Sequence, residues 1–182
     1  MPTTSEARPS RCCGCGAASR PPGANLVVHG DGTRERQVRG PASAEGEPQL
    51  GTVLVRRFEC QRCGACMVVV PREVMPRRLY TASAMGLALA LWALMGLGEA
   101  ATRTRVCPLA IVGTAAAARW MTLRRWATDA GAGRLFATSR APPLGFVRRQ
   151  HAERAAAALV ALAPAGLPLE QAAFAGGALH FG

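Results

Sequence analysis

The strongest constraint on the fold of this chain is a cysteine unit that occurs twice. The segments Cys12-x2-Cys15-Gly16 and Cys60-x2-Cys63-Gly64 share the same spacing and the same following glycine. Two residues between the cysteines let both sulfurs reach one ion, and the glycine accepts a left-handed turn that leaves backbone amides free to point at the sulfurs. Tetrahedral zinc takes two such thiolate pairs. The repeat therefore predicts one structural zinc ion, bound by Cys12, Cys15, Cys60 and Cys63.

The other three cysteines lack part of this pattern. Cys13 is too close to Cys15 for a knuckle, and Cys66 is followed by Met67 instead of glycine. We expect both to be bystanders and Cys107 to be a buried, small apolar residue. The N-terminus has no basic region followed by an apolar one, which predicts a cytoplasmic protein, where an odd number of cysteines favours metal ligation over disulfides.

Other chemistries for these residues are less favoured. A redox C-x-x-C normally occurs singly on a βαβ pattern, which this sequence lacks. His29 is a lone histidine in a strand-like segment, where hydrogen bonding is commoner than ligation. Four thiolates leave no coordination position for water, and no serine, cysteine or histidine has a base and an orienting group nearby in sequence. We therefore expect that the protein is not an enzyme.

The N-terminal half has the composition of a small antiparallel sheet. After a disordered tail over residues 1–10, residues 25–29 and 33–39 flank Gly30-Asp31-Gly32, which is typical of a hairpin turn. Residues 40–49 predict a flexible loop, and residues 52–58 and 67–70 predict strands that enter and leave the second cysteine pair. We expect a zinc ribbon over residues 11–78.

The C-terminal half is rich in Ala and Leu and predicts helices. The expected segments are 79–98, 108–118, a helix from Thr122, 149–163 and 169–179, with residues 100–104 separating the first two and a Pro-containing linker over 140–145. The predicted fold class is therefore α+β, with the antiparallel zinc ribbon followed by an all-α, helix-turn-helix-like bundle over 79–140. Residues 141–182 form the linker and C-terminal helices.

The charge of the chain indicates an anionic partner. All 22 basic residues are arginine, and the formal net charge is +11. Residues 101–154 alone hold ten arginines against two acids, a net charge of +8. Such a balance favours nucleic acid or an anionic membrane surface.

The helix expected near Thr122 separates apolar from basic residues. With Thr122 as N-cap, Leu123, Trp126 and Ala127 share one face, and Arg124 and Arg125 point elsewhere. This arrangement is similar to the third helix of a helix-turn-helix module, whose exposed arginines meet DNA. The alternative is an amphipathic helix with a solvated basic face.

The order of these features resembles the DNA-binding end of bacterial transposases. Over roughly residues 11–135 the chain is similar to transposase-associated zinc-ribbon plus helix-turn-helix proteins. The features that carry this resemblance are, in chain order, a C-x2-C-G knuckle, an Arg-rich hairpin, Val55-Arg56-Arg57-Phe58 before the second knuckle, Arg77-Arg78-Leu79-Tyr80 after it, and helices ending in Leu-Arg-Arg-Trp. The resemblance implies DNA binding. A catalytic carboxylate triad is missing, which implies a remnant or a regulator.

We therefore expect the chain to bind duplex DNA. The predicted contacts are Arg119, Arg124 and Arg125 on the helical part, with Arg56, Arg57, Arg77 and Arg78 of the ribbon adding phosphate contacts.

The sequence is also compatible with two other classes of protein. Residues 79–98 carry no charge and reach the minimum length of a membrane span, with Arg77 and Arg78 as cytoplasmic anchors, although their Ala and Gly content makes insertion marginal. The segment fits equally well as the first helix of a bundle. A zinc-ribbon protein-interaction module, with the Ala-rich C-terminal helices as an oligomer interface, is the other alternative.

Overall fold

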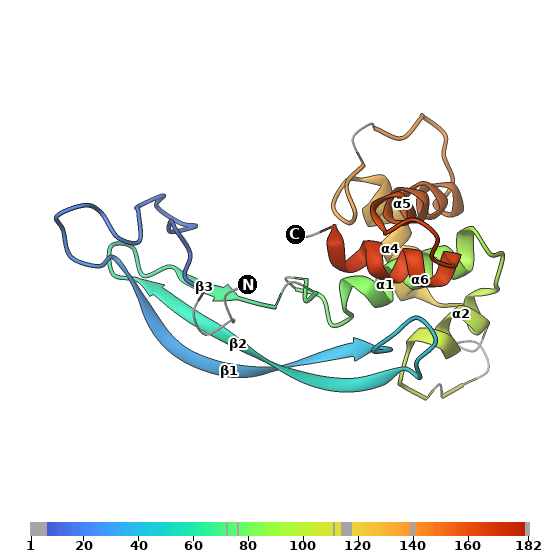
Figure 1. The fold of residues 1–182 in the computed structure, drawn as a ribbon, viewed down its shortest axis with the longest axis horizontal. Helices are drawn as coiled ribbons and strands as arrows, with labels where there is room; N and C mark the ends of the chain where they lie inside the picture. Colours follow the sequence, from blue (N-terminus) through green and yellow to red (C-terminus); the bar gives the residue numbers. More distant parts are fainter. Residues whose placement is uncertain are drawn as a thin grey trace. The chain divides into compact units, whose positions relative to one another are not determined.

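The computed structural model of the protein describes residues 7–71, 73–75, 77–110, 112–113, 118–138 and 141–180. The chain divides into two compact units (Figure 1). The first, here called the cysteine unit, comprises Met1–Gln37 and Thr52–Pro71, and the second, the helical unit, comprises Val38–Gly51 and Arg72–Gly182. The tip of the β1–β2 hairpin thus belongs with the helices and not with the cysteines.

The sheet has three strands in the order β1-β2-β3. They are β1 (Val28–Gly40), β2 (Gln49–Cys60) and β3 (Cys66–Val69). Strands β2 and β3 are antiparallel, with Phe58 opposite Met67. Residues 41–48 connect β1 to β2, as the predicted loop over 40–49 required. The α+β class with a small antiparallel sheet is confirmed.

The predicted turn at Gly30-Asp31-Gly32 is wrong, because this segment lies inside β1. The guanidinium of Arg56 in β2 crosses Gly30, so a Cβ atom there would lie 3.1 Å from Arg56 Nη2. Gly30 therefore makes room for a side chain of the neighbouring strand instead of forming a turn. Gly32 has a φ of +78°, which glycine adopts readily.

The cysteine unit has a small apolar core. Its buried members are Cys12, Val28, Phe58, Cys60 and Met67. Arg8 and Arg56 lie over the Phe58 ring, with their Cζ atoms 5.3 and 5.6 Å from its centroid.

Residues 7–10, within the predicted disordered tail, make contacts with the rest of the cysteine unit. The Arg8 guanidinium donates to the carbonyl oxygen of Val28, and the Ser19 hydroxyl donates to the carbonyl oxygen of Pro9. Residues 1–6 lie outside the described residues.

The helical unit is organised around α1 (Ala82–Ala93). The Thr81 hydroxyl caps this helix by accepting from the Ala84 amide at 3.2 Å. Every residue from Ala82 to Trp92 is buried, which is typical of a helix enclosed by others on all sides. Helices α5 (Arg148–Leu162) and α6 (Leu169–Leu179) pack against it, as predicted for segments 149–163 and 169–179 (Figure 1). Among the described residues, no helix has the length and apolar character needed to span a membrane.

The helix α2 (Glu99–Val106) occupies residues that were predicted to separate two helices. Glu99 in its first turn and Arg103 and Arg105 in its last turn interact favourably with the helix dipole, and Pro108 prevents extension of the helix. Of the predicted helix 108–118, residues 108–110, 112–113 and 118 are not helical, and the others lie outside the described residues. The next helix, α4 (Met121–Gly131), has Trp120 and not Thr122 as its N-cap.

Glycines allow α6 to lie against the backbones of α5 and α1. A Cβ atom on Gly176 would lie 1.9 Å from the Leu159 carbonyl oxygen, and one on Gly177 would lie 2.6 Å from the Ala82 carbonyl oxygen. Because the opposing atoms belong to backbones, neither can move aside without shifting a whole helix.

We expect Gly176→Ala to lower the free energy of unfolding of the helical unit by about 1–3 kcal/mol through overpacking. In a helix without such a close contact, the same change would raise the free energy of unfolding by about 1 kcal/mol. The sign of the change therefore shows whether α6 lies against the neighbouring backbone. Denaturant titration followed by circular dichroism measures it. Ala157→Gly, at an exposed position inside α5, is the control, because it reports the intrinsic preference for alanine without a close backbone contact. An equally or more stable Gly176→Ala variant would contradict the close approach.

Candidate functional site

The four cysteines of the two knuckles converge on one point. The Sγ atoms of Cys12 and Cys63 are 3.5 Å apart, those of Cys15 and Cys60 are 3.8 Å apart, and all four lie within 4.8 Å of one another. A tetrahedral ion with metal–sulfur bonds of about 2.3 Å requires sulfur–sulfur distances of about 3.8 Å. The predicted ligands Cys12, Cys15, Cys60 and Cys63 can therefore hold one metal ion.

The two knuckles have the same backbone structure. Gly16 and Gly64 both have a φ of 70°. Their amides donate to the carbonyl oxygens of Cys12 and Cys60 at 3.0 and 2.8 Å. The flanking residues pair in the same way, Arg11 with Ala18 and Glu59 with Cys66. No side chain would clash at either glycine, so glycine is required there for its left-handed conformation alone.

The protein dipoles around the sulfurs favour a thiolate. The backbone amides of Cys15 and Gly14 lower the pKa of Cys12 to about 6, and the Gly14 amide lies 3.3 Å from its Sγ atom. At Cys63 the Ala65 amide lowers the pKa, but the nearby Cys12 sulfur and desolvation outweigh it and raise the pKa to about 12. Four adjacent sulfurs cannot all be thiolates without a compensating cation, and a divalent metal supplies that charge.

The remaining cysteines and His29 stay outside this cluster, as predicted. Cys13 is exposed, and Cys66 accepts a hydrogen bond from Arg57 at 3.3 Å. Cys107, which the sequence predicts to be buried and apolar, is instead half-buried and accepts a hydrogen bond from the Tyr80 hydroxyl at 3.0 Å. The His29 ring bonds to the Leu26 carbonyl oxygen at 2.8 Å.

The arginines predicted to contact DNA from the ribbon differ in their availability. Arg56 lies over the Phe58 ring, and Arg57 pairs with Asp31 at 2.9 Å. Arg77 is exposed, and Arg78 pairs with Asp129 at 2.5 Å.

The predicted apolar face of α4 is confirmed, because Leu123, Trp126 and Ala127 are buried. Trp126 makes edge-to-face contacts with Trp120 and Tyr80, with ring centroids 5.2 and 4.9 Å apart. This aromatic group fixes α4 against the core.

The basic residues of α4 separate into one that is paired and one that is exposed. Arg124 donates to Glu99 Oε1 from Nε at 2.8 Å and from Nη2 at 2.6 Å, and its side chain is only 29% exposed. Arg125 is exposed, as is Arg119 in the segment before the helix. Arg124 therefore joins α4 to α2, a role that the sequence did not indicate.

Glu99 organises the start of α4 from a distance of more than twenty residues along the chain. Its Oε2 atom accepts from the Trp120 amide at 2.7 Å and so replaces the predicted Thr122 cap. Burial raises the pKa of Glu99, but the hydrogen bonds from Arg124 and Trp120 outweigh this and hold it below the usual value.

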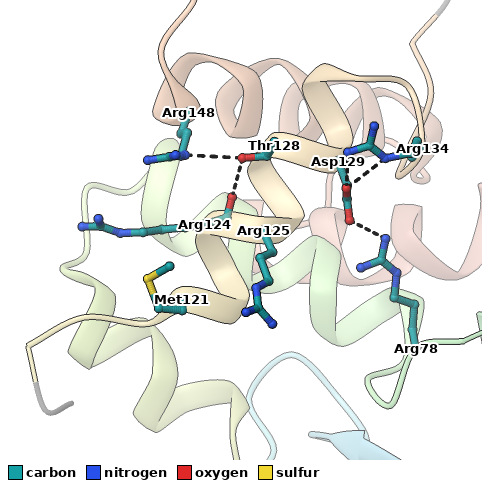
Figure 2. Close-up of a pocket in the computed structure, with 8 residues that line it drawn as sticks. All are labelled: Arg78, Met121, Arg124, Arg125, Thr128, Asp129, Arg134 and Arg148. Atoms are coloured by element: carbon teal, nitrogen blue, oxygen red, sulfur yellow. Dashed lines mark hydrogen bonds and ion pairs between the residues drawn. The ribbon is translucent and has the colours of Figure 1, made fainter.

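A pocket of about 320 Å³ lies beside α4 (Figure 2). It contains three arginines of the predicted DNA set, together with two that sequence reasoning did not select, Arg134 and Arg148. Only the net charge of residues 101–154 pointed to them. The full lining is Arg78, Met121, Arg124, Arg125, Thr128, Asp129, Arg134 and Arg148.

The chain matches no protein-family model, no curated protein and no solved structure. The resemblance to transposase-associated proteins therefore stays a prediction. The helix-turn-helix also stays a prediction. Residues 107–120 separate α2 from α4, which exceeds the three or four residues of a typical helix-turn-helix turn, and part of this segment lies outside the described residues.

We expect Glu99→Gln to lower the free energy of unfolding of the helical unit at pH 7 by about 1.5–3 kcal/mol, through loss of charge-assisted hydrogen bonds. The folded-state pKa of Glu99 is depressed, so its contribution is present above the ordinary glutamate pKa and is lost as pH falls through the folded-state pKa. The difference between variant and wild type should therefore shrink in acid. Urea titrations across pH measure it. Glu153→Gln, an exposed acid on α5, is the control, and a pH-independent difference would contradict the assignment.

Proposed function

We propose that this protein is a zinc-dependent DNA-binding protein without catalytic activity, a remnant or regulator related to transposase-associated zinc-ribbon proteins. The observation that carries the DNA-binding part is the surface of α4. Its apolar side is buried, Arg125 is exposed, and the helix lies within a segment whose net charge is +8. A strongly basic surface on a fixed helix is suited to the phosphate backbone of duplex DNA.

Zinc is the metal that the ligand set favours. A tetrahedral group of four thiolates is typical of zinc or iron, and zinc is the common structural ion in duplicated C-x2-C knuckles. Four protein ligands fill its coordination sphere, so the ion would stabilise the cysteine unit and activate no water.

The contacts among the predicted DNA-binding arginines rank their roles. Arg119 and Arg125 are exposed, as is Arg77, and these three are the best candidates for phosphate contacts. Arg124, Arg57 and Arg78 are paired with Glu99, Asp31 and Asp129, so their charges are partly neutralised within the protein.

We expect freshly purified protein to contain one zinc ion per chain. Cys15→Ser and Cys63→Ser should abolish stoichiometric zinc and unfold the cysteine unit, because binding of the ion is coupled to folding. Cys13→Ser and Cys66→Ser should retain zinc, since both lie outside the four-sulfur cluster. Elemental analysis by mass spectrometry measures zinc and iron together. One equivalent of iron would contradict the choice of metal, and no metal would contradict the site.

We expect the double variant Arg119→Ala, Arg125→Ala to bind duplex DNA more weakly than wild type while it keeps the Glu99–Arg124 pair. Each lost phosphate contact should reduce the slope of log K against log salt by about 0.9. Fluorescence anisotropy with a labelled duplex at several salt concentrations gives the slope. The double variant Arg20→Ala, Arg34→Ala removes the same charge from exposed positions of the cysteine unit. If the Arg119→Ala, Arg125→Ala variant keeps the wild-type affinity and salt slope, α4 does not contact DNA and its arginines form a solvated basic face.

A further inference from the structure

The pocket beside α4 gathers arginines from four segments of the helical unit. Arg78 precedes α1, Arg124 and Arg125 belong to α4, Arg134 follows α4, and Arg148 is the first residue of α5. Five arginines line this one pocket, so the fold or a bound anion must compensate their positive charge.

Internal carboxylates compensate only part of this charge. Asp129 lies between two arginines, with Oδ2 2.5 Å from Arg78 Nη2 and Oδ1 2.7 Å from Arg134 Nη2 (Figure 2). Glu99 binds Arg124 from outside the lining. Five guanidinium groups face two carboxylates, which leaves a net charge of +3.

Two of the arginines keep most of their side-chain donors available. Among the described residues, the Arg125 side chain makes no hydrogen bond or ion pair, and it is exposed. Within the same part of the chain, the Arg148 side chain makes one hydrogen bond, from Nε to the Thr128 hydroxyl oxygen at 3.4 Å. The Thr128 hydroxyl in turn donates to the Arg124 carbonyl oxygen at 3.0 Å, which orients its oxygen as an acceptor for Arg148 (Figure 2).

We propose that this pocket binds a phosphate group, with Arg125 and Arg148 as the principal donors. Guanidinium groups bind phosphate oxygens in pairs of parallel hydrogen bonds, so several of them around one concavity suit a phosphate better than a single-point anion. The volume of about 320 Å³ corresponds to roughly ten water molecules, which leaves room for an organic group attached to the phosphate. The source of the phosphate is a nucleic-acid backbone or a free phosphate ester.

This site goes beyond the proposed function in two respects. Arg134 and Arg148 lie outside the predicted DNA-binding set, and the pocket binds phosphate whether or not the chain binds duplex DNA. Asp129 also acquires a role that a structural ion pair would not have, because its carboxylate competes with the phosphate for Arg78 and Arg134. Removal of that carboxylate should therefore tighten phosphate binding.

The test is a titration of the full-length, metal-loaded protein with sodium phosphate at constant ionic strength, followed by NMR of arginine Nε–H groups. We expect saturable shifts for Arg125 and Arg148. Arg148→Gln and Arg125→Gln should each weaken the phosphate affinity by about tenfold, as loss of a charge-assisted hydrogen bond predicts. Arg34→Gln, which removes an exposed charge of the cysteine unit, should leave it within about twofold.

Asp129→Asn should change the phosphate affinity in the opposite direction and raise it, in a variant whose circular dichroism spectrum matches that of wild type. If this variant unfolds, the comparison of Arg148→Gln with Arg34→Gln tests the proposal without it. The absence of saturable shifts at Arg125 and Arg148 would overturn the proposal. So would equal weakening by Arg148→Gln and Arg34→Gln.

A second titration identifies the source of the phosphate and separates this proposal from DNA binding. A short duplex that moves the same resonances and is displaced by inorganic phosphate supports the backbone as source, whereas adenosine monophosphate moving them where a duplex does not supports a free ester. If the duplex binds but inorganic phosphate does not shift the Arg125 and Arg148 resonances, the phosphate site is overturned and the proposed function stands. If phosphate binds but the duplex does not, the phosphate site stands and the proposed DNA binding is overturned.

Discussion

The cysteine unit depends on the convergence of four sulfurs. Its buried core has only five members, and two of them, Cys12 and Cys60, belong to the metal-ligand set. A core of this size buries too little apolar surface to be stable by itself, so a bound ion would supply much of the free energy of folding. The three-stranded sheet, which brings residues 60–63 back to residues 12–15, can be understood as the device that closes this site.

The helical unit is stabilised in a different way. An apolar helix, α1, is enclosed by α5 and α6, and glycines rather than large side chains set the distance of α6 from its neighbours. Charged contacts then fix the outer helices, and the Glu99 carboxylate both starts α4 and holds Arg124. Arg124, Arg125 and Arg148 of the basic surface project from these packed helices, so their positions follow from the packing of α4 and α5.

The parts of this structure that sequence predicted are those in which the information is local. The spacing of the knuckle cysteines and the apolar periods of α5 and α6 are complete within a few residues. The predictions that were wrong concern positions whose structure depends on residues far away in the sequence. Gly30 lies under an arginine of the next strand, and the Trp120 amide at the start of α4 is bound by Glu99. The arginine pocket could not be predicted for the same reason, since its lining is assembled from four segments. The net charge gave the chemistry of that surface but not its shape.

Each knuckle buries its first cysteine and exposes its second. Cys12 and Cys60 are buried, whereas Cys15 and Cys63 face solvent. Cys15 and Cys63 are therefore the ligands that an oxidant in solution reaches first. Oxidation of either one would remove a thiolate from the four-sulfur cluster, so the lifetime of the folded cysteine unit would follow the redox state of its surroundings.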